Sequence, residues 1–277
     1  MKQLIADSGA SNTEWRVLDG AQVKAVTTVG ISPVYLKPAQ IKKILAKEVL
    51  PVAGEDVDRI WFYGAGVVGD LKDTLAACLA EAFPKAEIAV ESDMLAACRA
   101  LFGDGAGIAC ILGTGSNCCY WDGKNMTSVA KAGGFILGDE GSGAYMGKMF
   151  ISDYIKGLVP AALCKEFDKR YHLTYADIVS KVYREEAPSK FLAGFSLFIS
   201  EFSNHPYMKN LIMESLEAFI TRNVMHYDPR RTPVGFVGSV AEAYQGFICQ
   251  FFRNAGFKLG PLYGKPIDGL VKYHSGK

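Results

Sequence analysis

The sequence predicts an α/β protein built from two halves, each with a mixed β-sheet covered by helices on both faces. Two observations predict this fold class. Apolar runs with strand spacing alternate along the chain with segments of helical spacing. One pattern, in which three strands are joined by a small-residue turn and then an Asp-Gly turn, occurs near residue 2 and again near residue 108.

The first half opens with the stretch LIADSGASNTEWRVLDG, residues 4–20. Asp19-Gly20 between two apolar runs is a strong hairpin signal. The strands expected in this half cover residues 2–6, 13–18, 21–28, 59–66 and 86–92, and the expected helices cover residues 39–50, 71–83 and 93–102.

The second half repeats the opening pattern in residues 108–130, IACILGTGSNCCYWDGKNMTSVA, so that DSGAS at 7–11 falls on GTGSN at 113–117. The later segments with helical spacing cover residues 140–158, 161–185, 209–226 and 241–256, and a strand is expected over 234–238. The run GDGAG at 103–107 interrupts the apolar pattern. We therefore expect two domains, residues 1–106 and 107–265.

Composition excludes several classes of function. The chain has 277 residues, 49% of them hydrophobic and 21% charged, which suits two packed domains and argues against disorder. A net charge of +1 without a basic block argues against nucleic acid as a partner. No apolar run is long enough to cross a membrane, and the first residues lack the apolar region of a secretory signal.

Cysteine and histidine usage predicts a cytoplasmic protein without a zinc site. The seven cysteines form no CxxC pair and lie mostly in apolar runs, where cysteine acts as a small hydrophobic residue. The four histidines have no metal-ligand spacing.

The two small-residue turns are candidate phosphate loops. Such turns leave backbone N–H groups uncovered, and short hydroxyl side chains add donors for anionic oxygens. Each turn alone is more typical of an ordinary hairpin, but their repetition favours two loops that hold one triphosphate. Asp7 occurs in the first copy alone. Beside phosphates its carboxylate needs a divalent cation, so we expect it to act on Mg²⁺; alternatively, it caps the turn.

Gly238-Ser239 is a third candidate loop, because it lies between an expected strand and helix. Small residues at a helix N-terminus suit a ribose or an α-phosphate, although strand–Gly-Ser–helix is also a common packing joint.

Two further places carry acids suited to chemistry. Asp93 lies at a strand-to-helix junction, where it either accepts the proton of a substrate hydroxyl or, with Ser92, caps the helix. Asp139 and Glu140 lie among glycines that open a helix. Because glycine weakens a helix, these glycines suggest close approach of a ligand, and the acids suggest sugar hydroxyls as partners; helix-dipole compensation is the alternative.

The segments DSGASNTEW, GTGSNC, GGFILGDEGSGAYMG and GFVGSVA, in this order, resemble the N-acetylglucosamine kinase group of the BadF/BadG/BcrA/BcrD-type ATPases. That group belongs to the superfamily of sugar kinases, actin and heat-shock ATPases. The resemblance covers nearly the whole chain and implies two ribonuclease-H-like, actin-like ATPase lobes with ATP and sugar in an interdomain cleft. It also implies that the C-terminal segment 266–277 returns to the first lobe as a helix.

The resemblance assigns roles to residues. Asp7 would act on the Mg²⁺ shell and Asp93 would be the general base at the sugar's primary hydroxyl. ATP would be bound by two phosphate loops and an adenosine site, comprising Gly9, Ser11, Asn12, Thr13, Gly113, Thr114, Gly115, Gly238 and Ser239. The sugar would be bound by Asp93 together with Ser32, Ser116, Asn117, Gly134, Asp139 and Glu140. A homodimer is a further expectation from the family.

The chain departs from the family pattern at three positions. Asn12 replaces a basic residue of the first loop, Ser32 is the nearest polar substitute for a loop Asn, and Gly133 or a neighbour stands where relatives carry a Trp. Loss of the indole removes an apolar wall for an N-acetyl methyl group.

The leading hypothesis is therefore an ATP-dependent kinase that makes N-acetylglucosamine 6-phosphate. The alternatives are a kinase for another hexose and an ATPase that activates a partner enzyme, whose iron–sulfur cluster would need cysteines such as Cys118 and Cys119.

Overall fold

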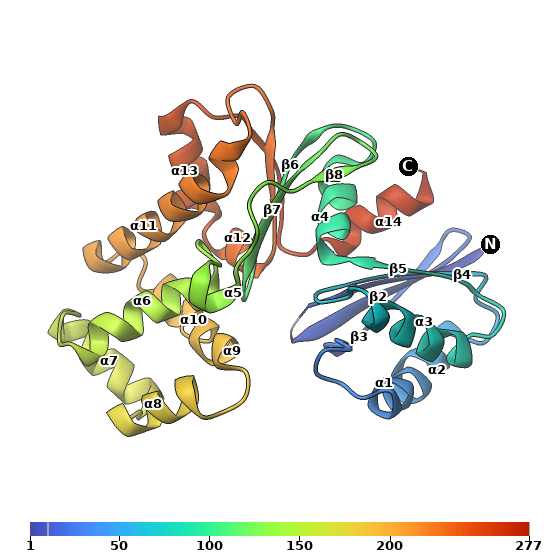
Figure 1. The fold of residues 1–277 in the computed structure, drawn as a ribbon, viewed down its shortest axis with the longest axis horizontal. Coiled ribbons are helices and arrows are strands. Elements are labelled where there is room, and N and C mark those ends of the chain that lie inside the picture. The colour runs from blue at the N-terminus through green and yellow to red at the C-terminus, as the bar shows by residue number, and fades with distance from the viewer. Residues whose placement is uncertain (10, 277) are drawn as a thin grey trace. The chain divides into compact units, whose positions relative to one another are not determined.

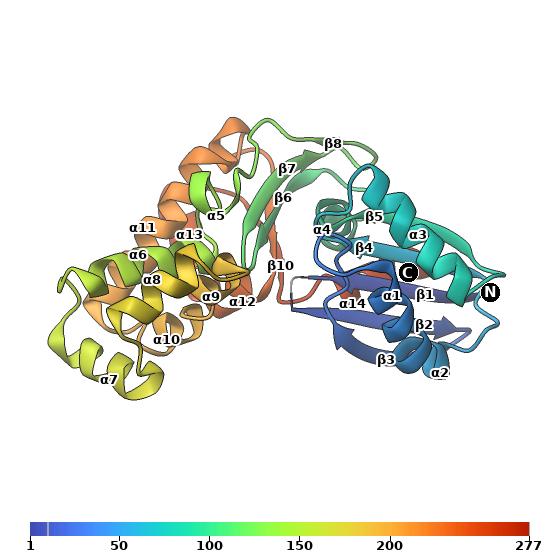
Figure 2. The same cartoon turned by 60° about the horizontal axis from the view of Figure 1, so that its bottom comes forward.

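In the computed structural model, the chain divides into two units, residues 1–104 with the C-terminal segment that begins at Lys265, and residues 105–264 (Figures 1 and 2). The structure describes residues 1–9 and 11–276. None of the helices in this described part combines the length and apolar character needed to cross a membrane.

The first unit is built on a five-stranded sheet with the order β3-β2-β1-β4-β5. Antiparallel pairing joins β1, β2 and β3, whereas β4 and β5 run parallel to β1. The strands are β1 (Lys2–Ser8), β2 (Asn12–Asp19), β3 (Gln22–Val29), β4 (Arg59–Gly64) and β5 (Glu87–Ser92).

Helices cover both faces of this first sheet (Figure 1). One face packs on the segment from α1 to α3, with the fully buried Trp15 and Phe62 in its core. The other face packs on α4 and the C-terminal helix α14, around the buried Ile5 and Tyr63. These elements are α1 (Pro38–Ile44), the π-helical η1 (Leu45–Val49), α2 (Leu50–Ala53), α3 (Asp70–Ala82), α4 (Asp93–Phe102) and α14 (Ile267–Ser275).

Helix α14 is fixed to the first unit by an aromatic and cationic cluster. His274 stacks on Trp61, with ring centroids 4.3 Å apart, and its Nε2 lies 2.8 Å from the hydroxyl of Tyr63. Burial and the charges of Arg99 and Arg59 lower the pKa of His274 to about 4. Gly269 lets the helix approach closely, because a Cβ there would lie 2.6 Å from the backbone oxygen of Ala100 on α4.

The second unit repeats the same sheet in the order β10-β9-β6-β7-β8. Again three strands pair antiparallel, β6 to β7 to β8, and two more, β9 and β10, run parallel to the first of them. The strands are β6 (Gly107–Leu112), β7 (Ser116–Trp121), β8 (Met126–Thr127), β9 (Val234–Val237) and β10 (Leu259–Tyr263). The expected fold class, two mixed sheets flanked by helices with ribonuclease-H-like topology, is confirmed.

The helices of the second unit form a large core with its sheet, rich in phenylalanine side chains that contact one another edge to face. They are α5 (Gly134–Leu137), α6 (Gly143–Ile155), α7 (Ala161–Tyr171), α8 (Tyr175–Tyr183), α9 (Pro188–Ala193), α10 (Ser196–Glu201), α11 (Pro206–Arg222), the 3₁₀ turn η2 (Val224–His226), α12 (Ser239–Ala243) and α13 (Gln245–Ala255).

Strand β10 was not expected from the sequence. Its residues include Gly260 and Pro261, which obscure the apolar pattern of a strand. It is an edge strand whose register shifts between Leu259 and Leu262, and a bulged edge is where proline is tolerated. The third strand expected after the second Asp-Gly turn is reduced to the two residues of β8.

Two expected helices are interrupted in the structure. The region 161–185 breaks at His172, which adopts a left-handed conformation, and Thr174 then caps α8 in a capping box with Asp177. The helix expected over 241–256 breaks at Tyr244, whose hydroxyl donates to the backbone oxygen of Ser196 over 2.9 Å. The short helices α9 and α10, separated by Gly194 and Phe195, were not predicted.

Gly147 on α6 is required by helix packing. A Cβ at this position would lie 2.0 Å from the backbone oxygen of Leu192 on α9, whereas a Cβ at Gly143 would make ordinary contacts of 3.4 Å. We expect Gly147→Ala to lower the free energy of unfolding by about 3 kcal/mol, as overpacking does. Chemical denaturation measures this loss, with Gly143→Ala as the matched control. Equal stability of the two variants would contradict the packing argument.

Candidate active site

The first candidate loop joins β1 to β2 in the first unit. The N–H of Gly9 donates to the backbone oxygen of Asn12 over 3.0 Å and closes the turn, while the backbone oxygen of Ser11 accepts from Gly30 over 2.9 Å. Gly9, Ser11 and Asn12 are exposed. The exposed side chains of Ser11 and Asn12 are thus available to a ligand.

Thr13 differs from the rest of this loop because its side chain is fully buried. Its hydroxyl lies 2.7 Å from that of Ser8, donates to the backbone oxygen of Val29 over 3.2 Å and accepts from the N–H of Ile31 over 3.0 Å. These bonds fix the segment after β3 to the hairpin. The Thr13 hydroxyl therefore stabilises the fold. Ser32, which follows Ile31 directly in the chain, is also buried.

The overlay of the two turns differs from the one expected. Strand β1 ends at Ser8 and β6 at Leu112, so Gly9 corresponds to Gly113 and Asp7 to Ile111. The sequence overlay, which placed Asp7 on Gly113, is wrong by two residues, because it matched small residues rather than strand ends. Asp7 thus belongs to the strand itself and precedes the turn.

Asp7 lies in a cluster of charges on the face of the sheet that packs on α4 and α14. Glu14 is its cross-strand partner, and Asp93 begins α4 at the carboxyl end of β5. Burial, followed by the negative charges of Asp93 and Glu14, raises the pKa of Asp7 to about 7, against a weaker opposing effect of Lys265.

Asp93 is not the cap of its helix. The hydroxyl of Ser92 accepts from the N–H of Leu95 over 3.2 Å and is the cap, which leaves Asp93 as the first helical residue. Burial raises the pKa of Asp93, although the backbone N–H groups of Met94 and of Asp93 itself partly offset this. A part-buried acid with a raised pKa at a strand end suits proton transfer.

Sequence reasoning missed two residues of this cluster, Glu14 and Lys265. The Nζ of Lys265 donates to Oε1 of Glu14 over 2.6 Å. Burial disfavours the charged form of Glu14, but Lys265, Arg16 and Thr27 outweigh this effect and lower its pKa. The two residues are 251 positions apart in the chain, so no local pattern could have joined them.

The second candidate loop joins β6 to β7 in the second unit. The N–H of Gly113 donates to the backbone oxygen of Gly115 over 2.9 Å. The start of α6 is tied to this turn, because the N–H groups of Gly143 and Ala144 donate to the backbone oxygens of Gly113 and Thr114 over 2.9 and 3.1 Å.

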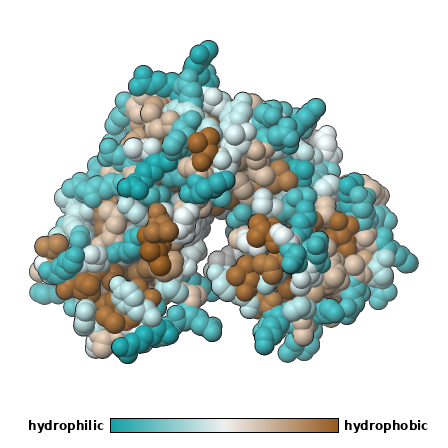
Figure 3. Space-filling model, in the orientation of Figure 1, coloured by the Kyte–Doolittle hydropathy of each residue, from teal (hydrophilic) through white to brown (hydrophobic). Residues whose placement is uncertain are grey.

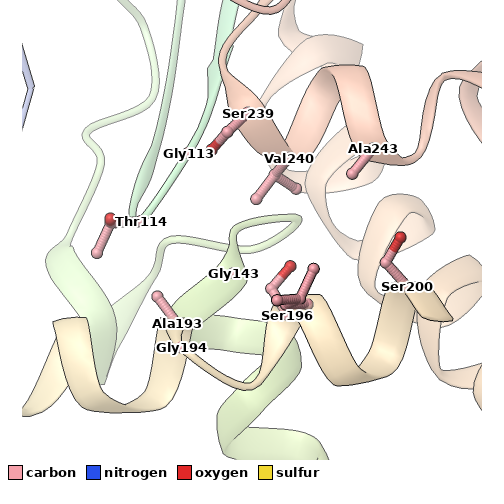
Figure 4. Close-up of a pocket in the computed structure, with 11 residues that line it drawn as sticks. Gly113, Thr114, Gly143, Ala193, Gly194, Ser196, Ser200, Ser239, Val240 and Ala243 are labelled. Carbon is pink, nitrogen blue, oxygen red and sulfur yellow. The ribbon is translucent and has the colours of Figure 1, made fainter. Parts of the chain in front are cut away.

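This loop and the third candidate loop line one cavity of about 320 Å³ (Figure 4). Thr114 contributes from the β6–β7 turn and Ser239 from the start of α12. Gly238 closes the junction, since it has φ +121° and a Cβ there would lie 2.2 Å from the backbone oxygen of Leu112. Sequence reasoning did not find the opposite wall, which α9 and α10 supply.

Three of the expected sugar residues meet in a second group of the same unit. The N–H of Ser116 donates to Oδ1 of Asp139 over 3.3 Å, and the hydroxyl of Ser116 donates to the backbone oxygen of Glu140 over 2.7 Å. Burial raises the pKa of Asp139, and the Ser116 N–H opposes this rise. Asp139 has a positive φ of 55°, a conformation uncommon outside glycine.

Glu140 is held by two residues that sequence reasoning missed. The side-chain amide of Asn223 donates to Oε2 of Glu140 over 3.4 Å, and Nη1 of Arg222 lies 3.4 Å from Oε1. Asn117, by contrast, turns its side-chain oxygen back to accept from the N–H of Cys118 over 2.8 Å. It is therefore not brought into the group of Ser116, Asp139 and Glu140 by a bond.

Packing explains two of the glycines that follow Asp139 and Glu140. Gly141 has φ +76° and abuts Phe219, and Gly147 abuts the backbone of Leu192. Packing therefore requires glycine at these two positions. Gly143 instead lines the cavity, and a Cβ there would make only ordinary contacts, so close approach of a ligand stays a prediction for Gly143.

Exposed apolar side chains come just before Asp139 and Glu140 in the chain. Gly134 begins α5, and Ile136 and Leu137 on the same helix are 70% and 82% exposed. Figure 3 shows apolar residues, in brown, at the surface of each unit. Cys118 and Cys119 are only 1% exposed, which does not suit an iron–sulfur cluster shared with a partner.

Comparison with solved structures decides the family. The structure of the "putative N-acetylglucosamine kinase" from Porphyromonas gingivalis is 40% identical in sequence, the match covers 99% of both chains, and the TM-score is 0.94. The chain belongs to the N-acetylglucosamine kinase group. It is therefore a sugar kinase with the actin-like ATPase fold.

More distant structures share the fold of this sugar kinase. A "putative N-acetylglucosamine kinase" from Chromobacterium violaceum is 17% identical over 98% of both chains, with a TM-score of 0.73. A ROK family glucokinase from Streptomyces griseus, in complex with glucose and AMPPNP, is 15% identical over 99% of this chain and 98% of that chain, with a TM-score of 0.58. No family model and no curated protein matches the chain.

Proposed function

We propose that this kinase transfers the γ-phosphoryl group of ATP to the primary hydroxyl of N-acetylglucosamine, giving N-acetylglucosamine 6-phosphate in the cytoplasm. Asp93 is the general base that accepts the proton of the sugar hydroxyl. Its position after β5 and its raised pKa support this role, because a base works best when its pKa approaches the operating pH.

The observation that carries the proposal is the pair of carboxyl groups, Asp7 and Asp93, at the carboxyl ends of β1 and β5. Burial disfavours the charged form of both carboxyl groups, and the negative charge of Asp93 raises the pKa of Asp7 further. A phosphoryl-transfer site needs one acid at the metal and another at the nucleophile. The pair offers these two roles.

The residues present fit Mg²⁺. Carboxylate oxygens are the ligands that Mg²⁺ prefers, and a divalent cation would relieve the repulsion among Asp7, Asp93 and Glu14. No group of three His, Cys, Asp or Glu residues in the described chain forms a closed metal site. Asp7 would thus hold the ion together with waters and phosphate oxygens, as is usual for Mg²⁺, and the ion would neutralise charge on the phosphates.

The second unit supplies the remaining contacts in this proposal. The cavity between Thr114 and Ser239 takes the nucleoside, and the N–H groups of Thr114 and Gly115 donate to its phosphates, while that of Gly113 closes the turn. Asp139 and Glu140, aligned by Ser116, accept hydrogen bonds from sugar hydroxyls. In the absence of the family's Trp, the exposed Ile136 and Leu137 offer the apolar surface for the N-acetyl methyl group.

A screen of ADP release with Mg²⁺ and ATP tests the proposal. N-acetylglucosamine is compared with N-acetylmannosamine, glucosamine and glucose, and the product is identified by its phosphate position. The expected result is the highest kcat/KM for N-acetylglucosamine with phosphate on the 6-hydroxyl. A higher kcat/KM for glucose would show that glucose, not N-acetylglucosamine, is the preferred substrate. The absence of sugar-dependent ADP release would overturn the proposed reaction.

A further inference from the structure

We propose that the nucleotide cavity of the second unit accepts guanine and hypoxanthine nucleotides nearly as well as adenine nucleotides. The inference rests on the proposed function, because it takes this cavity as the nucleoside site of the phosphoryl donor. It concerns the polar groups that can face the base.

Hydroxyl groups are the polar side chains of the cavity. Among the described residues that line it, the polar ones are Thr114, Ser196, Ser200 and Ser239, and the others are glycines or carry apolar side chains. Ser196 and Ser200 point from α10 toward Val240 and Ala243 of α12 (Figure 4). No charged side chain and no amide side chain lines it within the described chain.

Beyond the first turn of each helix, the N–H groups of the two helical walls are used within the helices. The N–H of Glu242 donates to the backbone oxygen of Gly238, and that of Tyr244 donates to Val240. On the other wall, the N–H of Ile199 donates to the backbone oxygen of Phe195. The hydroxyl of Ser196 lies 3.3 Å from that of Tyr244. Beyond the first turns, the helical walls therefore leave hydroxyl groups, that of Ser200 above all, as the adaptable partners of a base.

A hydroxyl does not distinguish adenine from guanine well. Adenine presents a donor at its 6-amino group, whereas guanine presents an acceptor at O6. A serine hydroxyl has one donor and two acceptor lone pairs, and it rotates to suit its partner. Strong discrimination, by factors of ten thousand or more, arises where a fixed donor or acceptor is left unpaired by the wrong ligand.

The rest of the cavity favours any purine. Leu197, Val240 and Ala243 provide apolar surface for the flat faces of the ring, and burial of apolar area is non-directional. The affinity supplied by these contacts is the same for adenine, guanine and hypoxanthine. The base thus contributes to affinity while adding little selectivity.

Two measurements test the inference in the full chain with Mg²⁺. Dissociation constants for ATP, GTP and ITP are measured by calorimetry, and kcat/KM for each is measured with saturating N-acetylglucosamine. We expect the values for GTP and ITP to lie within about thirtyfold of those for ATP. A difference of that size corresponds to the loss of a weak contact, whereas a polar group left unpaired in the site would cause a much larger one. A larger preference for ATP, or no binding of any triphosphate, would overturn the inference.

The variant Ser200→Ala tests the role of the hydroxyl, with Ser196→Ala as its matched partner on the same helix face. We expect the ratio of the ATP and GTP dissociation constants to change by less than about fivefold in either variant, because each hydroxyl serves both bases. A larger change would reveal a fixed partner and overturn the inference. Should all three triphosphates bind alike while no sugar is phosphorylated, the proposed function would fail and this inference would stand.

Discussion

Replacing Asp93 by asparagine is expected to lower kcat for sugar phosphorylation about a thousandfold, which corresponds to about 4 kcal/mol in the activation barrier. The amide keeps the size of the side chain but cannot accept the proton of the sugar hydroxyl. Affinity for the nucleotide should persist, since no role in nucleotide binding is assigned to Asp93. Initial rates and calorimetric titration of a non-hydrolysable ATP analogue measure the two effects.

Ser92→Ala is the matched control for this variant. Ser92 caps α4 through its bond to the N–H of Leu95, so its loss should cost about 1 kcal/mol of stability. It carries no proposed role in chemistry, and its kcat should remain close to that of the unchanged protein. Near-normal turnover in Asp93→Asn would remove Asp93 from the role of base, and an equal loss in both variants would attribute the effect to the helix.

The repeated architecture was predictable because its signals are local. Asp-Gly turns and small-residue turns between apolar runs mark hairpins, and each unit contains them at its start. The core of each sheet follows the same signals, since alternation along β2 buries Trp15 and Val17. Strand β10 escaped prediction because Gly260 and Pro261 replace the residues that would have shown the pattern.

The residues of the candidate site that stand at strand ends were predictable, whereas their distant partners were not. Asp7, Asp93 and the glycine turns stand at strand ends, where α/β proteins place ligands, and position along the chain reveals this. Their partners could not be found in that way. Lys265 reaches Glu14 across the whole sequence, and Asn223 reaches Glu140 from the end of another helix.

The same limit explains the walls of the cavity that we propose as the nucleoside site. Its second wall comes from α9 and α10, short helices whose positions depend on tertiary packing rather than on a long periodic pattern. The glycines of α6 show the converse. Their unfavourable helix propensity suggested a ligand, but Gly147 is required because the backbone of Leu192 lies against it.

Replacing Asp7 by asparagine is expected to raise the Mg²⁺ concentration needed for half-maximal activity about a hundredfold and to change its dependence on pH. Because the pKa of Asp7 is raised to about 7, its ionised fraction falls nearly tenfold between pH 8 and pH 6. A metal binds the ionised form, so the apparent Mg²⁺ affinity of the unchanged protein should fall as pH falls through 7.

The phosphates of ATP also titrate near this pH. The decisive quantity is therefore the difference between the two proteins in the pH dependence of the apparent Mg²⁺ affinity. Asp7→Asn should retain the pH dependence of ATP and lose the additional part that belongs to the carboxylate.

The pH dependence of stability is a second, independent test of Asp7. Its pKa is higher in the folded state, so the folded state keeps this proton to a higher pH than the unfolded state does. The carboxyl group therefore destabilises the fold increasingly as pH rises from about 4 to 7. Without Mg²⁺ at pH 8, Asp7→Asn should therefore unfold at a higher temperature than the unchanged protein. A variant that is both less active and less stable would instead assign Asp7 to the fold.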